Sequence, residues 1–391
     1  MPSGWHLVSL QDGSLHPPDL DDDNADGEGE SEIPWVLLED RAYVADRRNA
    51  TTASSDSNRF GAEIQVTFCF ARPPRVSYLC VFCSRRPADA KEAEVIAMEP
   101  KVLFTDANLV LLRIYLSPDK ERIFERAVPP LSLRLQAQIL EVHTVSVEDQ
   151  QFQEHQSQGY FLHHSSKVIA IGGKDGTMGF VDLWRGILLC DLLLVKDIPA
   201  LRYVKVPPLL LQDEIHGDGR LSRDIAVVGD RIRFVQQKTF WKPCPLYVDQ
   251  YIPVGWTAST WSRLVTSPVE DPWEREHTIR SSEMDISNSQ FELLPKMHDN
   301  VGRPLPPFEM LNVCQPTLSL RAGDASVCFM VKVDFDGDEA WVIDVDMSNN
   351  KLQGVTEFDA TRSACFVFAY LHSGVSKYLN VQSLQKTKVT G

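Results

Sequence analysis

The sequence predicts a mostly-β chain: a propeller-like array of short antiparallel strands and hairpins with few short helices. Three observations favour this fold class. Apolar and polar residues alternate with a period of two from Gly61 onward, which is typical of half-buried strands. Turn signals recur roughly every 8–12 residues, with little helical period. Together they indicate about twenty strands, which a radial array of about five to seven blades accommodates better than one two-sheet sandwich.

The first strand pair carries the clearest alternation. In residues 62–71 the side chains of Ile64, Val66 and Phe68 share one face. The segment Arg72-Pro73-Pro74-Arg75 ends this strand, because proline cannot donate to a ladder. Residues 76–83 resume as a second strand, so we expect two antiparallel neighbours with a proline-bearing connection.

The same unit of strand, turn and strand recurs along the chain. Glycine turns follow residue 171 and residue 228, where a positive φ is easiest for glycine. Two short helices are predicted, at 120–126 and 147–158, and prolines mark loops at 243–245 and 295–307. The further predicted strands are 94–98, 101–105, 109–116, 167–171, 178–183, 224–228, 231–236, 327–335, 340–346 and 351–358.

The chain divides by composition into three parts. Residues 1–34 form an N-terminal segment whose run 19–32 holds eight acidic side chains and no basic one. Such a run is typical of a disordered, solvated stretch, and its functional alternative is an acidic docking strip for a basic partner. Residues 35–380 are expected to form a single β-rich domain, and residues 381–391 a C-terminal tail.

Charge and cysteine content bear on location and partners. The 391 residues carry a net charge of −15, and no basic face is visible, so the composition argues against nucleic-acid binding. No signal peptide and no transmembrane segment is recognisable, so no membrane association is expected. Five of the eight cysteines sit in apolar runs, where cysteine behaves as a small buried hydrophobe. We therefore expect an intracellular protein of the cytoplasm or nucleus.

Several motifs are familiar in combination. They are residues 35–38 (WVLL) with 43–53 (YVADRRNATTA), 64–68 with 73–78, 180–191 (FVDLWRGILLCD), 201–208 (LRYVKVPP) and 255–262 (GWTASTWS). In this order they resemble the large, grass-expanded plant family called domain of unknown function 1618. The resemblance covers about residues 35–380, with its most recognisable core at about 178–310. It implies plant origin and a β fold similar in style to the propeller-like domains of plant ubiquitin-ligase adaptors. It supplies no catalytic residues.

The third motif has two interpretations. As a turn between strands, Asp182 would accept hydrogen bonds from turn amides, Trp184 would cover the turn, and Gly186 would permit the bend. As a recognition patch, Asp182, Trp184 and Arg185 would face a partner, because tryptophan and arginine are common interface anchors.

Motifs for metal or cofactor binding are incomplete. Cys80-x-x-Cys83 lacks the second ligand pair of a structural zinc site. The acidic run that begins at Asp334 lacks the glycine and glutamate of a calcium loop, and the glycines after residue 171 open into a strand rather than a helix. We expect no cofactor, no metal site and no catalytic residue that the sequence can name.

The functional hypothesis is a non-enzymatic protein-interaction module on a rigid β scaffold, with an unknown protein partner. One alternative is a hydrolase-type enzyme whose site lies in a propeller mouth. Another is a small-ligand sensor built on Trp241, Trp256, Trp261 and Trp273. The sequence favours interaction over catalysis.

Overall fold

The computed structural model describes most of the 391 residues in two compact units. Unit 1 comprises residues 1–136 and 358–391, and unit 2 comprises residues 137–357, so the predicted domain 35–380 spans both. The described residues are 10–20, 33–56, 62–85, 95–96, 98–117, 131–132, 163–173, 175–193, 201–207, 217–244, 251–295, 311–334, 337–362 and 368–378. Within them strands dominate, which confirms the mostly-β, propeller-like prediction.

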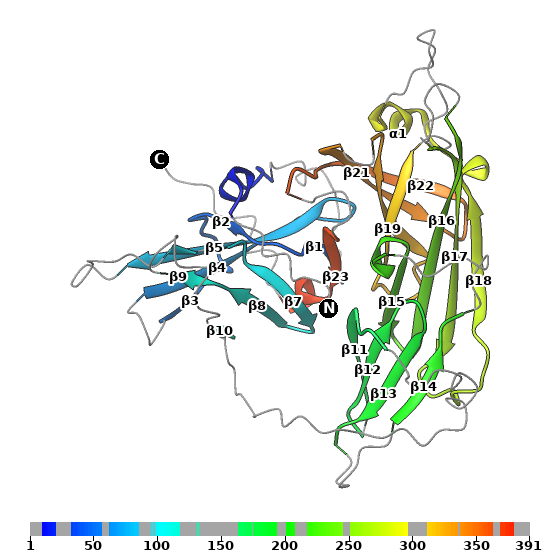
Figure 1. The fold of residues 1–391 in the computed structure, drawn as a ribbon, viewed down its shortest axis with the longest axis horizontal. Coiled ribbons are helices and arrows are strands. Elements are labelled where there is room, and N and C mark those ends of the chain that lie inside the picture. The colour runs from blue at the N-terminus through cyan, green and yellow to red at the C-terminus, as the bar shows by residue number, and fades with distance from the viewer. Residues whose placement is uncertain are drawn as a thin grey trace. The chain divides into compact units, whose positions relative to one another are not determined.

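Unit 1 is built around a six-stranded sheet of mixed direction, drawn mainly in blue in Figure 1. The central strand β5 pairs antiparallel with β4 on one side and parallel with β1 and β2 on the other. The pairing of β4 with β5 confirms the first predicted strand pair. The strands are β1 (Val36–Glu39), β2 (Tyr43–Val44), β3 (Ala53–Asp56), β4 (Ala62–Cys69), β5 (Val76–Arg85) and β23 (Tyr370–Ser373).

Two smaller sheets complete unit 1. A three-stranded sheet has the order β10–β8–β7, and β6 pairs with β9. One face of β7 and β8 supplies Val102, Leu112 and Ile114 to a core shared with the six-stranded sheet. The bounds are β6 (Val95–Ile96), β7 (Lys101–Asp106), β8 (Leu109–Ile114), β9 (Leu116–Ser117) and β10 (Leu131–Ser132).

A buried ionic network joins distant segments of unit 1. The Arg362 guanidinium lies 2.9 Å from a Glu39 oxygen and 3.2 Å from a Glu99 oxygen, and it stacks 3.7 Å from the centre of the Tyr43 ring. Arg41 lies 3.0 Å from the other Glu99 oxygen. Burial raises the pKa of Glu39 to about 8 in spite of the Arg362 charge. Because buried charges require partners, this network ties together segments that lie up to 323 residues apart.

Unit 2 contains three consecutive four-stranded antiparallel sheets, each with its strands in chain order. This up-and-down order is that of propeller blades. The first sheet comprises β11 (Lys167–Gly172), β12 (Thr177–Asp182), β13 (Gly186–Asp191) and β14 (Leu201–Lys205). The second comprises β15 (Arg223–Val228), β16 (Arg231–Pro243), β17 (Tyr251–Leu264) and β18 (Glu274–Arg280). The third comprises β19 (Asn312–Leu318), β20 (Ser326–Lys332), β21 (Glu339–Asp346) and β22 (Lys351–Asp359).

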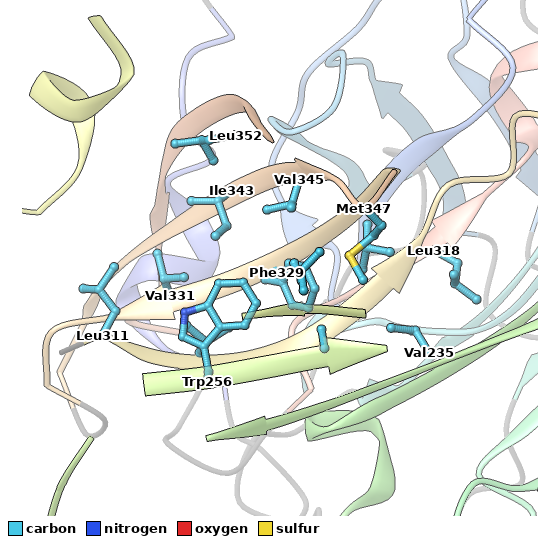
Figure 2. Close-up of a cluster of buried hydrophobic side chains, with 14 of the residues drawn as sticks. Val235, Trp256, Leu311, Leu318, Phe329, Val331, Ile343, Val345, Met347 and Leu352 are labelled. Atoms are coloured by element: carbon cyan, nitrogen blue, oxygen red, sulfur yellow. The ribbon is translucent and has the colours of Figure 1, made fainter. Parts of the chain in front are cut away.

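The middle sheet of unit 2 is buried on both faces. Phe234 and Trp261 pack on one face against the first sheet. Val235 and Trp256 pack on the other face against the third sheet, where the Trp256 ring centre lies 5.3 Å from that of Phe329 (Figure 2). Alternation along β16 therefore fills two different cores with neighbouring residues, as stacked sheets require.

Some predicted elements differ from the structure. The described residues hold three sheets of blade topology rather than five to seven, because unit 1 uses parallel pairs instead of repeating the meander. Strand β16 extends to Pro243, well past the predicted end at residue 236. The short helix α1 (Asn288–Leu293) was not predicted. The helices predicted at 120–126 and 147–158, nearly all of the acidic run and the tail 381–391 lie outside the described residues.

Across the described ranges, no helix has the length and apolar character needed to cross a bilayer.

Candidate functional site

The turn between β12 and β13 places the three predicted partner-facing residues together. Asp182 is the last residue of β12 and is only 1% exposed. Its Oδ1 accepts a hydrogen bond from the Trp184 amide at 2.9 Å, which confirms the predicted turn-amide contact. Its Oδ2 accepts from the His164 amide and from the Arg185 guanidinium, both at 3.0 Å. Trp184 and Arg185 are half-buried.

These contacts determine the charge state of Asp182. Burial alone would raise the pKa of this carboxyl. Hydrogen bonds from the His164 and Trp184 amides and from Arg185 outweigh burial, so the pKa lies below its ordinary value. An ionised carboxylate that already accepts three hydrogen bonds is a weak base. The side chain therefore organises the turn, and a partner-facing role for Trp184 and Arg185 stays a prediction.

Trp184 forms part of a stack that joins two sheets. The Arg223 guanidinium, which comes from β15, lies 4.1 Å from the centre of the Trp184 ring. Arg223 is 1% exposed and donates a 2.9 Å hydrogen bond to the Leu183 carbonyl. On its other side the Trp184 indole donates to the Gly217 carbonyl at 3.1 Å. A desolvated cation over tryptophan is a strong contact, so the stack fixes the first sheet against the second.

Gly186 is required for a reason different from the predicted bend. A Cβ at this position would lie 2.5 Å from the Val204 carbonyl oxygen and 2.6 Å from the Tyr203 ring. Glycine is therefore needed because neighbouring β14 approaches closely.

Two further polar residues adjoin the turn. The Nε2–H of His163 donates to the Phe180 carbonyl at 3.1 Å, and its ring packs edge-on against that of Tyr203. Burial lowers the pKa of His163 and raises the pKa of Tyr203. Burial thus favours the neutral forms of His163 and Tyr203, while both oxygens of Asp182 are already used in hydrogen bonds.

The inner strands of the three sheets are linked by one carboxylate. Asp224 of β15 accepts a 2.7 Å hydrogen bond from Lys167 Nζ of β11. Its other oxygen accepts from the Leu318 amide of β19 at 3.1 Å. Lys167 also donates to the Ile225 carbonyl at 2.7 Å. Sequence reasoning missed Asp224, because its partners lie 57 and 94 residues away.

Other candidate groups from the sequence are dispersed. Trp256 and Trp261 pack in different cores on opposite faces of the middle sheet, and Trp273 packs beside Trp261, whereas Trp241 is 47% exposed. Cys80 and Cys83 of β5 likewise face different clusters. Within the described part of the chain, no three His, Cys, Asp or Glu side chains come together as a metal-binding group.

The second candidate surface lies on the long hairpin made by β16 and β17 (Figure 1). The ladder with β15 ends at Gln236 and the ladder with β18 ends at Thr257. Beyond these points residues 238–243 and 251–255 pair only with each other within the sheet. We call these residues the distal ribbon. A prediction that extended the strand to the proline pair at 243–245 would have found it.

Large apolar side chains on the distal ribbon are exposed. Trp241 is 47% exposed, Tyr251 is 64% exposed and Phe240 is 41% exposed. The register opposes Trp241 to Pro253 and Pro243 to Tyr251. Directly opposed residues share a face of the ribbon, so Trp241 and Tyr251 lie on the same face. Phe240 and Lys242 lie on the other.

Comparison with known proteins agrees with the motif resemblance. The family model described as "Protein of unknown function (DUF1618)" matches residues 180–328, which confirms the predicted family over that stretch. The match begins in β12, two residues before Asp182, and ends in β20. No curated protein and no solved structure matches the chain.

Proposed function

We propose that this chain, whose residues 180–328 match the DUF1618 family, is a non-enzymatic protein-interaction module. The three sheets of unit 2 form a rigid frame, and the distal ribbon is the surface offered to a partner protein. The observation that carries the proposal is the exposure of Trp241 and Tyr251 on one face of the two-stranded distal ribbon.

The chemistry of the distal ribbon supports this use. Aromatic side chains are enriched in the buried centres of protein interfaces, and Trp and Tyr dominate binding hot spots. Lys238 and Lys242 are the charged residues of the ribbon. They would favour a partner whose apolar groove has an acidic rim.

The state of the titratable groups supports binding rather than catalysis. Asp182 and Asp224 use both carboxylate oxygens in hydrogen bonds that hold turns and strands. Arg223 is committed to the Trp184 stack. Catalytic groups need an open coordination or hydrogen-bonding position toward a substrate. The hydrolase and ligand-sensor alternatives stay predictions.

The test is affinity purification of the intact chain from cells that express it, followed by mass spectrometry. The variant Trp241→Ala/Tyr251→Ala removes two exposed side chains, so its thermal stability should match that of the unchanged chain. We expect it to lose a stoichiometric partner, with binding weaker by about tenfold or more. Leu264→Ala is the matched control, because Leu264 is 40% exposed at the opposite end of β17.

Recovery of the chain without partners under several conditions would contradict the interaction role. A partner that binds the double variant as tightly as the unchanged chain would contradict the ribbon as its surface.

A further inference from the structure

Two cysteines of unit 1 lie side by side on one face of a sheet. Cys69 ends β4 and Cys80 lies in β5, and the register pairs Thr67 with Cys80 and Cys69 with Tyr78. The two cysteines are therefore diagonal neighbours on the same face. Their sulfur atoms are 4.0 Å apart, and the residues are 7% and 1% exposed.

An N-terminal strap covers this face. We use this name for residues 17–20, which are held by Tyr78 and by two arginines. The Tyr78 hydroxyl donates to the Pro18 carbonyl at 2.6 Å. Arg47 donates to the Pro17 carbonyl at 3.2 Å and pairs with the Asp19 carboxylate at 2.6 Å.

The strap also completes the apolar cluster above the thiols. Leu20 packs against the cluster of Tyr43, Cys69, Tyr78 and Cys80. Arg75 donates to the Asp19 carbonyl at 3.0 Å. The Asp19 side chain is 79% exposed, and exposed ion pairs contribute little to stability. The hydrogen bonds that hold the strap come from the side chains of Arg47, Arg75 and Tyr78, so opening it would leave the ladder between β4 and β5 intact.

The environment makes the two thiols chemically unequal. The hydrogen bond from Cys80 and the Arg47 charge lower the pKa of Cys69 in spite of burial. The same hydrogen bond and burial raise the pKa of Cys80. Burial also raises the pKa of Cys190, Cys314 and Cys328. Since the thiolate is the nucleophile, Cys69 is the attacking group of the pair.

We propose that Cys69 and Cys80 form an oxidation site, in which a peroxide converts the thiol pair to a disulfide and the N-terminal strap controls access. The Cys69 thiolate attacks one peroxide oxygen, the O–O bond breaks, and a sulfenic acid and hydroxide result. The Cys80 sulfur then displaces the sulfenic oxygen, which leaves as water. The proton released from Cys69 converts the hydroxide to water. The two sulfurs lose two electrons in total, and one peroxide becomes two waters.

The required movement is small. A disulfide bond is about 2.05 Å long, so the sulfurs must approach by about 2 Å. Cys69 is the last residue of β4, so the end of this strand can move toward Cys80 while the ladder before it stays paired. Cys83 cannot compete for Cys80, because its side chain packs on the opposite face of the sheet.

The test uses the intact, fully reduced chain, treated with hydrogen peroxide and then with an alkylating agent. Peptide mass spectrometry identifies which cysteines are linked. We expect a Cys69–Cys80 disulfide to form in the folded chain, at an equal rate in Cys83→Ser. Leu20→Ala removes the strap side chain that packs on the thiol cluster, leaves the Arg47 charge in place, and should raise the rate several-fold. Leu15→Ala is the matched control, because Leu15 is 45% exposed and lies outside the strap.

Two results would overturn the proposal. Oxidation of Cys83 or Cys244 while Cys69 and Cys80 stay reduced would exclude the site. Equal rates for Leu20→Ala, Leu15→Ala and the unchanged chain would exclude control by the strap. The measurement on the unchanged chain decides the first point even if a variant fails to fold.

Discussion

At the residue scale, the structure separates side chains that maintain the fold from those that face solvent. Asp182, Arg223 and Gly186 are all almost fully buried around one turn. Asp182 and Arg223 each make specific hydrogen bonds, and Gly186 lies where a side chain would clash with β14. Substitutions at these positions should therefore act on stability first.

Gly186→Ala should destabilise the chain by about 1–3 kcal/mol, because overpacking forces strand β14 to shift. The added methyl would meet the Val204 carbonyl oxygen at 2.5 Å. Denaturant unfolding measures the difference. Gly374→Ala is the control, since a Cβ there meets nothing within 4 Å. Equal stability of the two variants would show that β14 does not approach Gly186 as closely as described.

Asp344 should make unfolding pH-dependent. Burial, with the nearby charges of Asp324 and Asp346, raises the pKa of Asp344 from 3.8 to about 7. Between these pH values the folded chain holds a proton that the unfolded chain has released. The free energy of unfolding should therefore fall as pH rises from about 4 to about 7.

The variant Asp344→Asn carries no titrating group at this position. The free energy of unfolding of the unchanged chain minus that of Asp344→Asn should fall from about pH 4 to about pH 7. Above about pH 7 this difference should stay constant. Urea unfolding at several pH values measures this difference. A difference that does not change between pH 4 and pH 7 would contradict the raised pKa.

At the scale of elements, adjacent sheets are joined by a few polar bridges in addition to their apolar faces. Lys167, Asp224 and the Leu318 amide connect the first strands of all three sheets in unit 2. The Arg223–Trp184 stack connects the first two. These bridges determine how neighbouring sheets are positioned, because apolar faces alone permit sliding.

Asp224→Asn should cost about 1–3 kcal/mol, because the Lys167 ammonium loses its ionic partner in a mostly buried place. Glu283→Gln removes the exposed pair with Arg280 and should change stability by less than about 0.5 kcal/mol. Thermal unfolding of both variants checks the contrast. Comparable effects would mean that the bridge between the inner strands is unimportant.

At the scale of the whole molecule, each hydrophobic cluster belongs to one unit. The two clusters of unit 2 draw on residues between Ile169 and Val355. Those of unit 1 draw on residues from Leu20 to Leu116 and on Leu371 and Val375. Within the described residues, the core of each unit is thus internal to it.

A fragment of residues 163–357 should therefore fold alone and unfold cooperatively, because it keeps both cores of unit 2. A fragment of residues 180–328, the extent of the family match, should not. It lacks β11, β21 and β22, and with them Ile169, Ile343 and Leu352. Circular dichroism with thermal melting distinguishes the fragments. Cooperative melting of the isolated fragment 180–328 would contradict this account.

The sequence by itself determined the strand pairs that are close along the chain. Strands β4 and β5, β11 and β12, and β20 and β21 were all predicted near their observed bounds. Hairpin register depends on alternation and on turn residues that lie within a few positions of each other. The same locality made the Asp182 turn and the family resemblance recognisable. The sequence also suggested a ligand-binding group of Trp241, Trp256, Trp261 and Trp273. It did not show that, of these four, only Trp241 is largely exposed.

Only the tertiary structure decided the contacts between distant segments. Strand β1 pairs with β23, Arg362 enters a site between Glu39 and Glu99, and the strap covers Cys69 and Cys80. Each such contact closes a long loop, and many alternative partners of similar polarity exist along the chain. Packing of complete sheets selects among them. For this reason the strap over the thiol pair, on which the further inference rests, became visible only in the folded chain.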